Sequence, residues 1–306
     1  MAYYLGIDGG GTKTRCVLGD ENSVVASAVS GGSNIVRLGE TRVREALREV
    51  IRHVCSTAEI SPHQIRSICV GASGAGRPEM ASKIRAIVAE LDPQLSSENI
   101  QVVGDTVIAL EAGFGSGPGV ITIAGTGSIA FGRDAAGRTE RAGGWGFAVS
   151  DEGSGQWIGR QAVSAVLHSH DRREETALTA QILEAWKLAD LDALVQFANS
   201  TPPPEFPRLF PVVLRAAEAG DAVAEEVLTR AGTELAALAS IVIRRITSDP
   251  PYVPVATTGS VFRQSAEVRR VFYNRLNASF SGIVVRNEPV EPVLGALALA
   301  RAAARG

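Results

Sequence analysis

The chain has 306 residues, of which 45% are hydrophobic and 21% are charged, as is ordinary for a folded soluble protein. This length is long for one compact unit, so we expect two domains. The formal net charge of -3 gives no reason to expect a polyanionic partner and argues against nucleic-acid binding. No uncharged apolar run reaches membrane-spanning length, and no basic region followed by a long apolar segment begins the chain. We therefore expect a cytoplasmic protein without a membrane partner.

The cysteines and histidines do not form a metal-binding pattern. Cys16, Cys55 and Cys69 show no Cys-x-x-Cys spacing, and the four histidines do not cluster with them. A structural zinc or iron–sulfur site needs clustered soft ligands. The sequence therefore predicts buried core thiols and no metal held by cysteine or histidine.

Strands and helices alternate along the first part of the chain. A strand at 3–7, a glycine turn, and strands at 14–18 and 23–30 predict a three-stranded meander. A helix with apolar positions from Val43 to Val54 follows. After it the pattern predicts a strand at 65–70, a helix at 78–91, a strand at 100–103 and a helix at 106–112. This alternation predicts an α/β lobe.

Residues 119–132 repeat the opening pattern. Laying Asp8 over Ala124 aligns the two strands and the glycines of the two turns. Two copies of one meander predict a duplicated domain. We expect a first domain at 1–117 and a second at 118–306, whose final helix is able to pack back on the first domain.

The second domain carries additional helices. The pattern predicts helices at 154–168, 174–189 and 221–246, with a proline-rich loop at 201–204. The chain then continues with a strand at 252–256, a turn at 257–260, a helix at 266–276, a strand at 282–285 and a final helix at 290–303.

The two glycine turns are candidate phosphate-binding loops. Glycines tolerate positive φ and let backbone N–H groups converge on an anion. One such turn alone is equally consistent with a tight hairpin, but a second at the equivalent place favours a pair that holds both ends of a polyphosphate. The candidate residues are Gly10, Gly11, Thr12 and Lys13 in the first turn, and Thr126, Gly127 and Ser128 in the second.

Two aspartates lie at strand ends beside these turns. Asp8 is a candidate ligand for Mg²⁺, directly or through water, although an aspartate there can also bond to its own turn. Asp105 starts a helix, so it can be a helix N-cap. It can also accept the proton of an attacking hydroxyl, since phosphoryl transfer needs only a weak base.

Several other residues are candidate ligand contacts. Five glycines, Trp145 and the acidic pair Asp151-Glu152 lie within residues 143–155, where the acids can also simply complement a helix dipole. The loop around Asn34 is a weaker signal, because such loops are more often turns. Gly232 interrupts a strong helix, which indicates either close helix packing or a bound adenine ring. The turn at 259–260 could flank the same pocket.

This set of motifs resembles the superfamily of acetate and sugar kinases, heat-shock chaperones and actin. Within it, the sequence looks like the N-acetylglucosamine kinase branch, also called the BadF/BadG type, from the first strand to the final helix. The resemblance implies an α/β fold of two ribonuclease-H-like, actin-like ATPase domains with ATP in a central cleft. The cysteine clusters of the zinc-binding and iron–sulfur relatives are absent, which argues against both.

The resemblance also implies roles for single residues. It places the ATP phosphates on the two glycine turns and the adenosine near Gly232, Gly259 and Ser260. It implies Asp105 as the base that acts on the sugar 6-hydroxyl. It places Asn34, Asp105, Gly144 or Trp145, and Asp151 around the sugar. Ser150 stands where the family usually has glycine, which puts the backbone geometry beside Asp151 in doubt.

The function expected from these features is ATP-dependent phosphorylation of an amino sugar, with N-acetylglucosamine first and glucosamine or N-acetylmuramic acid as alternatives. The cofactors expected are ATP and Mg²⁺, and a homodimer fits the family. Two rivals of other classes are a non-catalytic sugar or nucleotide sensor and an ATPase that drives a partner.

Overall fold

The computed structural model describes residues 2–92, 94–247 and 253–305. The chain forms two compact units, one of Met1–Gly117 with Val290–Gly306 and one of Pro118–Pro289. Each unit is built on a five-stranded sheet, in the order β3-β2-β1-β4-β5 in the first and β10-β9-β6-β7-β8 in the second. The second order read backwards is an antiparallel meander followed by two parallel strands, as in the first. The predicted α/β class and the duplication are therefore confirmed.

The first unit places a sheet between helices. Its strands are β1 (Tyr3–Gly9), β2 (Lys13–Gly19), β3 (Val24–Gly31), β4 (Ile65–Ala72) and β5 (Ile100–Gly104). Its helices are α1 (Ile35–Thr57), α2 (Pro78–Ala89), α3 (Asp105–Phe114) and α11 (Pro292–Ala303), with short 3₁₀ turns at Pro62–Gln64 and Ser97–Asn99. Helices α1 and α2 enclose the larger core of this unit, in which buried valine, leucine and isoleucine side chains predominate. Burial of these side chains supplies the main driving force for folding.

The parallel strands of the first unit bring its candidate residues to one edge of the sheet. β1 runs parallel to β4, with Asp8 opposite Gly71, and β4 runs parallel to β5. The carboxyl ends of β1, β4 and β5 therefore lie together. Asp8, the β1–β2 turn, the loop after β4 and the first turn of α3 all lie at this edge.

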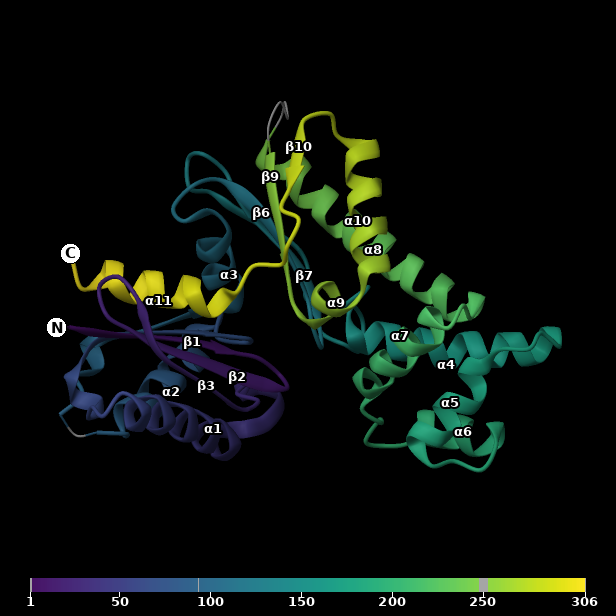
Figure 1. Cartoon of the computed structure of the whole chain (residues 1–306), viewed down its shortest axis with the longest axis horizontal. Helices are drawn as coiled ribbons and strands as arrows, with labels where there is room; N and C mark the ends of the chain where they lie inside the picture. Colours follow the sequence, from purple (N-terminus) through teal and green to yellow (C-terminus); the bar gives the residue numbers. More distant parts are fainter. Residues whose placement is uncertain (1, 93, 248–252, 306) are drawn as a thin grey trace. The chain divides into compact units, whose positions relative to one another are not determined.

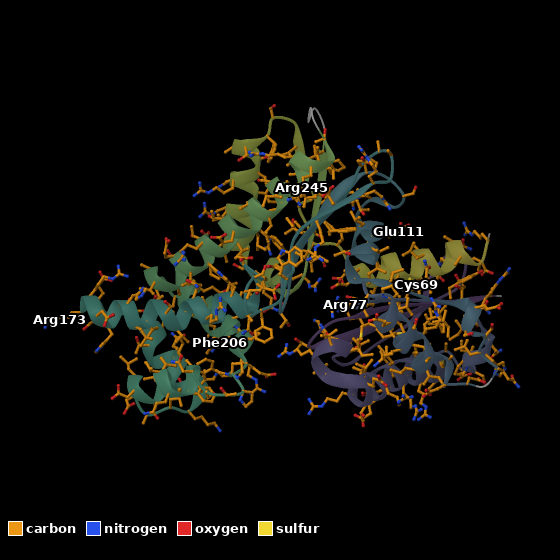
Figure 2. All side chains as sticks on the ribbon, turned by 180° about the vertical axis from the view of Figure 1, so that it is seen from behind. Cys69, Arg77, Glu111, Arg173, Phe206 and Arg245 are labelled. Atoms are coloured by element: carbon orange, nitrogen blue, oxygen red, sulfur yellow. The ribbon has the colours of Figure 1, made fainter. Side chains whose placement is uncertain are left out.

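The final helix α11 packs on the first unit, against β1 and α3 (Figure 1). Glycines allow this close approach. A Cβ on Gly6 would lie 2.4 Å from the backbone nitrogen of Leu297, and one on Gly295 would lie 2.0 Å from the carbonyl oxygen of Ile108. Cys69 is fully buried in the small core between these elements (Figure 2).

The second unit carries more helices. Its strands are β6 (Gly119–Ala124), β7 (Ser128–Arg133), β8 (Thr139–Gly143), β9 (Val253–Thr258) and β10 (Ile283–Val285). Its helices are α4 (Gly155–Arg172), α5 (Ala177–Trp186), α6 (Leu191–Ala198), a 3₁₀ turn at Phe206–Leu209, α7 (Phe210–Glu218), α8 (Ala222–Ile246), α9 (Ser260–Gln264) and α10 (Ala266–Ser279). Phe206 packs edge-on against Trp186 and contributes to the core beneath the helices (Figure 2).

Some predicted boundaries differ from the observed ones. The turn predicted at 257–260 is wrong at its start, because Thr257 and Thr258 continue β9 as buried residues. The strand predicted at 252–256 begins with Tyr252, which lies outside the described residues. The loop at 201–204 does connect two helices, α6 and α7. In the part of the chain that the structure describes, no helix has both the length and the apolar character needed to cross a membrane.

Candidate active site

The first glycine turn packs directly on the segment that follows β3. The N–H of Gly10 donates to the carbonyl of Lys13 at 3.0 Å and closes the turn, while the N–H of Ser33 donates to the carbonyl of Gly10 at 2.9 Å. A Cβ on Gly9 would lie 2.5 Å from the Ser33 Oγ, and one on Gly32 would lie 2.5 Å from the Gly11 carbonyl. A side chain at either position would disturb this packing, and the two hydrogen bonds hold the backbone of the turn against the segment after β3. Residues 12 and 13 at its tip are exposed.

Asp105 lies at the carboxyl end of β5, as the first residue of α3. Its N-cap residue is Gly104, so the N-cap function considered for Asp105 falls to its neighbour. The Ser73 Oγ donates to Asp105 Oδ2 at 2.6 Å, and the N–H of Thr106 donates to Oδ1 at 3.0 Å. Burial raises the pKa of Asp105, and these hydrogen bonds lower it in part. The result is a fixed carboxyl group that is a somewhat stronger proton acceptor than an exposed aspartate.

Ser73 joins Asp105 to the first glycine turn. Its N–H donates to the carbonyl of Gly9 at 2.9 Å, while its hydroxyl holds Asp105. Sequence reasoning did not select Ser73. The signal that could have found it is its position in a run of small residues directly after a strand parallel to β1, at the edge where Asp8 and Asp105 also lie.

Asn34 and Asp8 occupy the same edge of the first sheet. Asn34 is the N-cap of α1, and its Oδ1 accepts from the N–H groups of Val36 and Arg37, both at 3.1 Å. Among the described residues nothing bonds to its side-chain NH₂, which therefore remains able to donate to a ligand. Asp8 is half-buried in β1, opposite Arg15 of β2.

The second glycine turn is bonded to the loop before α4. The N–H of Gly125 donates to the carbonyl of Gly127 at 2.9 Å, and the carbonyl of Gly125 accepts from the N–H of Gly155 at 2.8 Å. The Ser128 hydroxyl donates to the carbonyl of Glu152 at 2.6 Å. The candidate phosphate turn and the candidate sugar loop of this unit therefore form one bonded structure.

Asp151 lies against the second turn. Its Oδ1 accepts from the N–H of Ser128 at 3.4 Å, and a Cβ on Gly127 would lie 2.9 Å from its Oδ2. Burial raises the pKa of Asp151, and the charge of Glu152 raises it further. Asp151 has a φ of 67°, in the left-handed region that is costly for most residues and that recurs at functional sites. Ser150, the residue in doubt from the sequence, donates its hydroxyl to Glu152 Oε2 at 3.1 Å.

Trp145 does not lie in the buried part of this loop. Its side chain is 72% exposed, and the guanidinium of Arg141 stacks over its ring at 4.2 Å from the centroid. Gly144 before it has a φ of 69°, and a Cβ there would lie 2.8 Å from the Ile129 Cδ1. The Trp145 ring therefore faces solvent on the surface of this loop, with Arg141 as its stacking partner.

The three residues expected near adenosine fall into two places. Gly259 has a φ of 105°, and a Cβ on it would lie 2.1 Å from the carbonyl of Ala124, so it packs on the end of β6 directly before the second turn. Ser260 follows it as the first residue of α9. Gly232, in α8, instead lies against α10, where a Cβ would be 2.8 Å from the Val271 Cβ. Close helix packing is thus sufficient reason for this glycine.

The chain is similar over nearly its whole length to kinases of amino sugars. It is 33% identical to N-acetylmuramic acid/N-acetylglucosamine kinase of Clostridium acetobutylicum, over 98% of this chain and 99% of that protein. It is 30% identical to N-acetyl-D-glucosamine kinase of Dictyostelium discoideum, over 97% of each chain. The crystal structure of a candidate N-acetylglucosamine kinase from Chromobacterium violaceum matches with a TM-score of 0.75 at 27% identity, over 98% of this chain and 99% of that one.

These matches extend through both units and confirm the predicted two-domain fold. The model of the BadF/BadG/BcrA/BcrD ATPase family matches residues 5–300, from β1 to α11. The chain belongs to the BadF/BadG/BcrA/BcrD ATPase family.

Proposed function

We propose that this protein transfers the γ-phosphoryl group of ATP to the 6-hydroxyl of an amino sugar, with N-acetylglucosamine as the first candidate. Glucosamine and N-acetylmuramic acid are the alternatives. The observation that carries the proposal is the carboxyl group of Asp105, held by Ser73 beside a glycine turn. The names of the relatives, which are kinases of these sugars, support it.

In this proposal Asp105 orients the sugar hydroxyl and accepts its proton. Burial raises the pKa of this carboxyl group, which makes it a better acceptor while Ser73 fixes the direction of its oxygens. Phosphoryl transfer passes through a loose transition state in which the attacking oxygen bears little charge. A positioned carboxylate of modest basicity is therefore sufficient.

The glycine turns would bind the polyphosphate of ATP. Gly10, Gly11, Thr12 and Lys13 would line the phosphates from the first unit, with Lys13 supplying a cation, and Thr126, Gly127 and Ser128 would line them from the second. The N–H groups of Gly10 and Ser128 bond within the protein and shape these turns. Fixed backbone conformations at both turns support this assignment, because a preorganised donor set loses little entropy when it binds.

A magnesium ion fits this arrangement as a partner of the phosphates. Within the ranges that the structure describes, no three histidine, cysteine or acidic side chains come together. A single carboxylate such as Asp8, beside a candidate phosphate turn, suits Mg²⁺, which keeps several waters and binds one or two carboxylates together with substrate phosphates. Asp8 would hold the ion, and the ion would neutralise phosphate charge.

Asn34, Gly144 or Trp145, and Asp151 would contact the sugar. Backbone N–H groups donate to the Oδ1 of Asn34 and to the carboxyl group of Asp151, and so orient both side chains for recognition of hydroxyl and amide groups. Adenosine contacts at Gly232, Gly259 and Ser260, the homodimer and the cytoplasmic location remain predictions.

The decisive experiment measures ADP release with N-acetylglucosamine, glucosamine, N-acetylmuramic acid, 6-deoxy-N-acetylglucosamine and no sugar. We expect turnover with at least one sugar that has a 6-hydroxyl, and background release with the 6-deoxy sugar and without sugar. Release that is independent of sugar would instead indicate a partner-driven ATPase. Binding without release under all conditions would indicate a sensor.

A further inference from the structure

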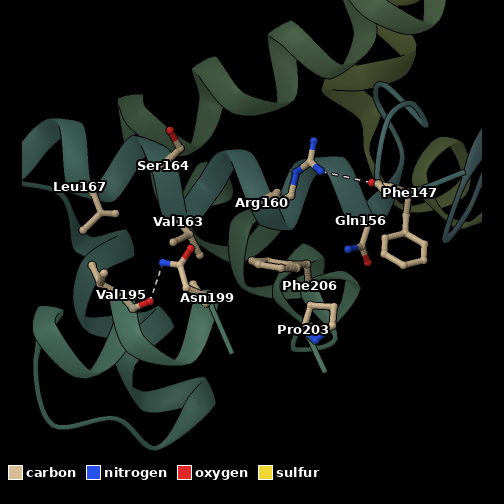
Figure 3. A pocket seen from close by; sticks show the side chains of 12 residues that line it. Phe147, Gln156, Arg160, Val163, Ser164, Leu167, Val195, Asn199, Pro203 and Phe206 are labelled. Atoms are coloured by element: carbon tan, nitrogen blue, oxygen red, sulfur yellow. Dashed lines mark hydrogen bonds between the residues drawn. The ribbon is translucent and has the colours of Figure 1, made fainter. Parts of the chain in front are cut away.

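A pocket of about 410 Å³ lies in the second unit, beside the loop that carries the candidate sugar contacts (Figure 3). Phe147 and Ala148 of this loop form one wall, between Trp145 and Asp151 in the sequence. The opposite walls come from α4, α6 and the 3₁₀ turn that contains Phe206. The volume is at the lower end of the range for small-molecule sites. It is sufficient for a substituent of a sugar.

The pocket has an amide group that is available to a ligand. Gln156, on the first turn of α4, is only 8% exposed, and its side chain projects into the space between Phe147 and Phe206 (Figure 3). In the described parts of the chain nothing bonds to its side-chain amide. Its amide atoms are not among the fully buried polar atoms without a partner, so they are accessible from the pocket. They can donate to and accept from a ligand there.

The pocket also has a cation without a counter-charge. Arg160 lies one turn further along α4, and its Nη1 donates to the carbonyl of Phe147 at 3.2 Å. Among the described residues no carboxylate forms an ion pair with it. Both residues belong to the first two turns of an 18-residue helix, whose N-terminus favours anions. The remaining walls are mainly aliphatic or aromatic, including Val163 and Phe206.

We infer that this pocket receives an apolar-stemmed carboxylate attached to the amino sugar, with Arg160 and Gln156 as the residues that select it. The 3-O-lactyl group of N-acetylmuramic acid has this chemistry: a methyl group suits the apolar walls, and a carboxylate suits the guanidinium and the amide. The inference rests on the proposed kinase activity and decides among its substrates. It makes this chain a kinase of both N-acetylmuramic acid and N-acetylglucosamine.

The test compares kcat/KM for N-acetylglucosamine, N-acetylmuramic acid and the methyl ester of N-acetylmuramic acid. The ester has nearly the same shape without the charge. The variants are Arg160→Gln and Arg160→Lys, with Arg172→Gln as a control that removes one positive charge from the same helix away from the pocket.

We expect the unsubstituted enzyme to use both natural sugars and to prefer the acid over its ester. Arg160→Gln should lower the ratio of kcat/KM for N-acetylmuramic acid to that for N-acetylglucosamine by about 10- to 100-fold, since a hydrogen bond to a charged group is lost. It should also abolish the preference over the ester. Arg160→Lys should retain part of both preferences, and Arg172→Gln should retain them fully. Turnover of N-acetylglucosamine by the same preparation shows that each variant is folded.

Two results overturn the inference and leave the proposed function intact: phosphorylation of N-acetylglucosamine without N-acetylmuramic acid, or an unchanged ratio in Arg160→Gln. Failure of the unsubstituted enzyme to phosphorylate any amino sugar contradicts the proposed function, and the inference with it.

Discussion

Ser73 connects the ends of three parallel strands through two hydrogen bonds. Its N–H bonds to the carbonyl of Gly9 at the end of β1, and its hydroxyl bonds to Asp105 Oδ2 at 2.6 Å, where β5 gives way to α3. Ser73 itself follows β4. One small residue therefore positions the candidate base relative to the candidate phosphate turn. Substitutions of Ser73 and Asp105 are for this reason the most informative tests of the site.

Replacement of Asp105 by asparagine should remove the proton acceptor and preserve the shape of the side chain. The Asp105→Asn variant keeps an oxygen that can accept from Ser73. We expect kcat to fall by about 10²- to 10⁴-fold, the usual contribution of general base catalysis. Affinities for ATP and sugar, measured by calorimetry, should change little.

The matched control is Asp192→Asn, which removes an exposed carboxylate from the first turn of α6. It should retain full activity. Near-normal turnover by Asp105→Asn would show that another group, or water, accepts the proton.

Replacement of Ser73 by alanine should shift the pH dependence of activity. The base acts in its deprotonated form, so kcat/KM falls as the pH drops through the pKa of Asp105. Burial raises this pKa, and the Ser73 hydrogen bond lowers it. Loss of the hydroxyl should therefore raise the pKa further and move the acid limb of the pH profile to higher pH.

The pH profile separates this positioning function from a purely structural one. Ser73→Ala should give a lower kcat at its optimum together with the shifted limb, whereas Ser73→Thr, which keeps the hydroxyl, should restore the position of the limb. A lower kcat with an unmoved acid limb would contradict a direct effect of Ser73 on Asp105.

Much of the fold follows from local sequence patterns. The meander at 3–30 shows apolar strands separated by glycine-rich or polar turns, and the same pattern returns at 119–132. Both signals depend on neighbours in the sequence, so they can be recognised without tertiary information. Asp105 was recognisable for the same reason, as a carboxylate at a junction of strand and helix.

Other features depend on contacts between distant segments. The contact between Ser73 and Asp105 forms only when β4 pairs with β1 in the folded sheet, so it cannot be recognised from neighbouring residues in the sequence. Helices α6 and α7 were missed because they are short, and short amphipathic segments are hard to distinguish from loops. The pocket at Gln156 could not be predicted from the sequence, because a loop, two helices and a 3₁₀ turn that are separate in the sequence form its walls.

The second turn offers a steric test of its coupling to Asp151. In Gly127→Ala the new Cβ would lie 2.9 Å from Asp151 Oδ2, whereas in Gly125→Ala it would meet nothing within 4 Å. The carboxyl group must move in the first variant only. We expect Gly127→Ala to lower the free energy of unfolding by about 1–3 kcal/mol, as other overpacking substitutions do.

Activity should follow the same order, with a larger loss of kcat/KM in Gly127→Ala than in Gly125→Ala. Denaturant unfolding and steady-state kinetics measure the two effects. Equal losses in both variants would show that the backbone of the turn matters and that its contact with Asp151 does not.

Substitutions at Gly232 distinguish the two explanations of this glycine, which are close packing of α8 on α10 and contact with a bound adenine ring. A Cβ there would lie 2.8 Å from the Val271 Cβ and 2.9 Å from the carbonyl of Val268, so Gly232→Ala should push α8 and α10 apart. Overpacking costs about 1–3 kcal/mol, which exceeds the gain of about 1 kcal/mol from the better helix propensity of alanine, or cancels it at the lower limit. The additional substitution Val271→Ala removes the atoms that collide.

If packing alone requires this glycine, the double variant should be more stable than the sum of the single effects, by a coupling free energy of about 0.5–3 kcal/mol. Its KM for ATP should also return toward the unsubstituted value. We expect both the stability and the KM for ATP to recover, because the close contact with α10 is sufficient reason for a glycine at this position. A double variant that regains stability but keeps a raised KM for ATP would place Gly232 at the nucleotide instead, since Val271→Ala relieves the helix contact without restoring space for a ligand.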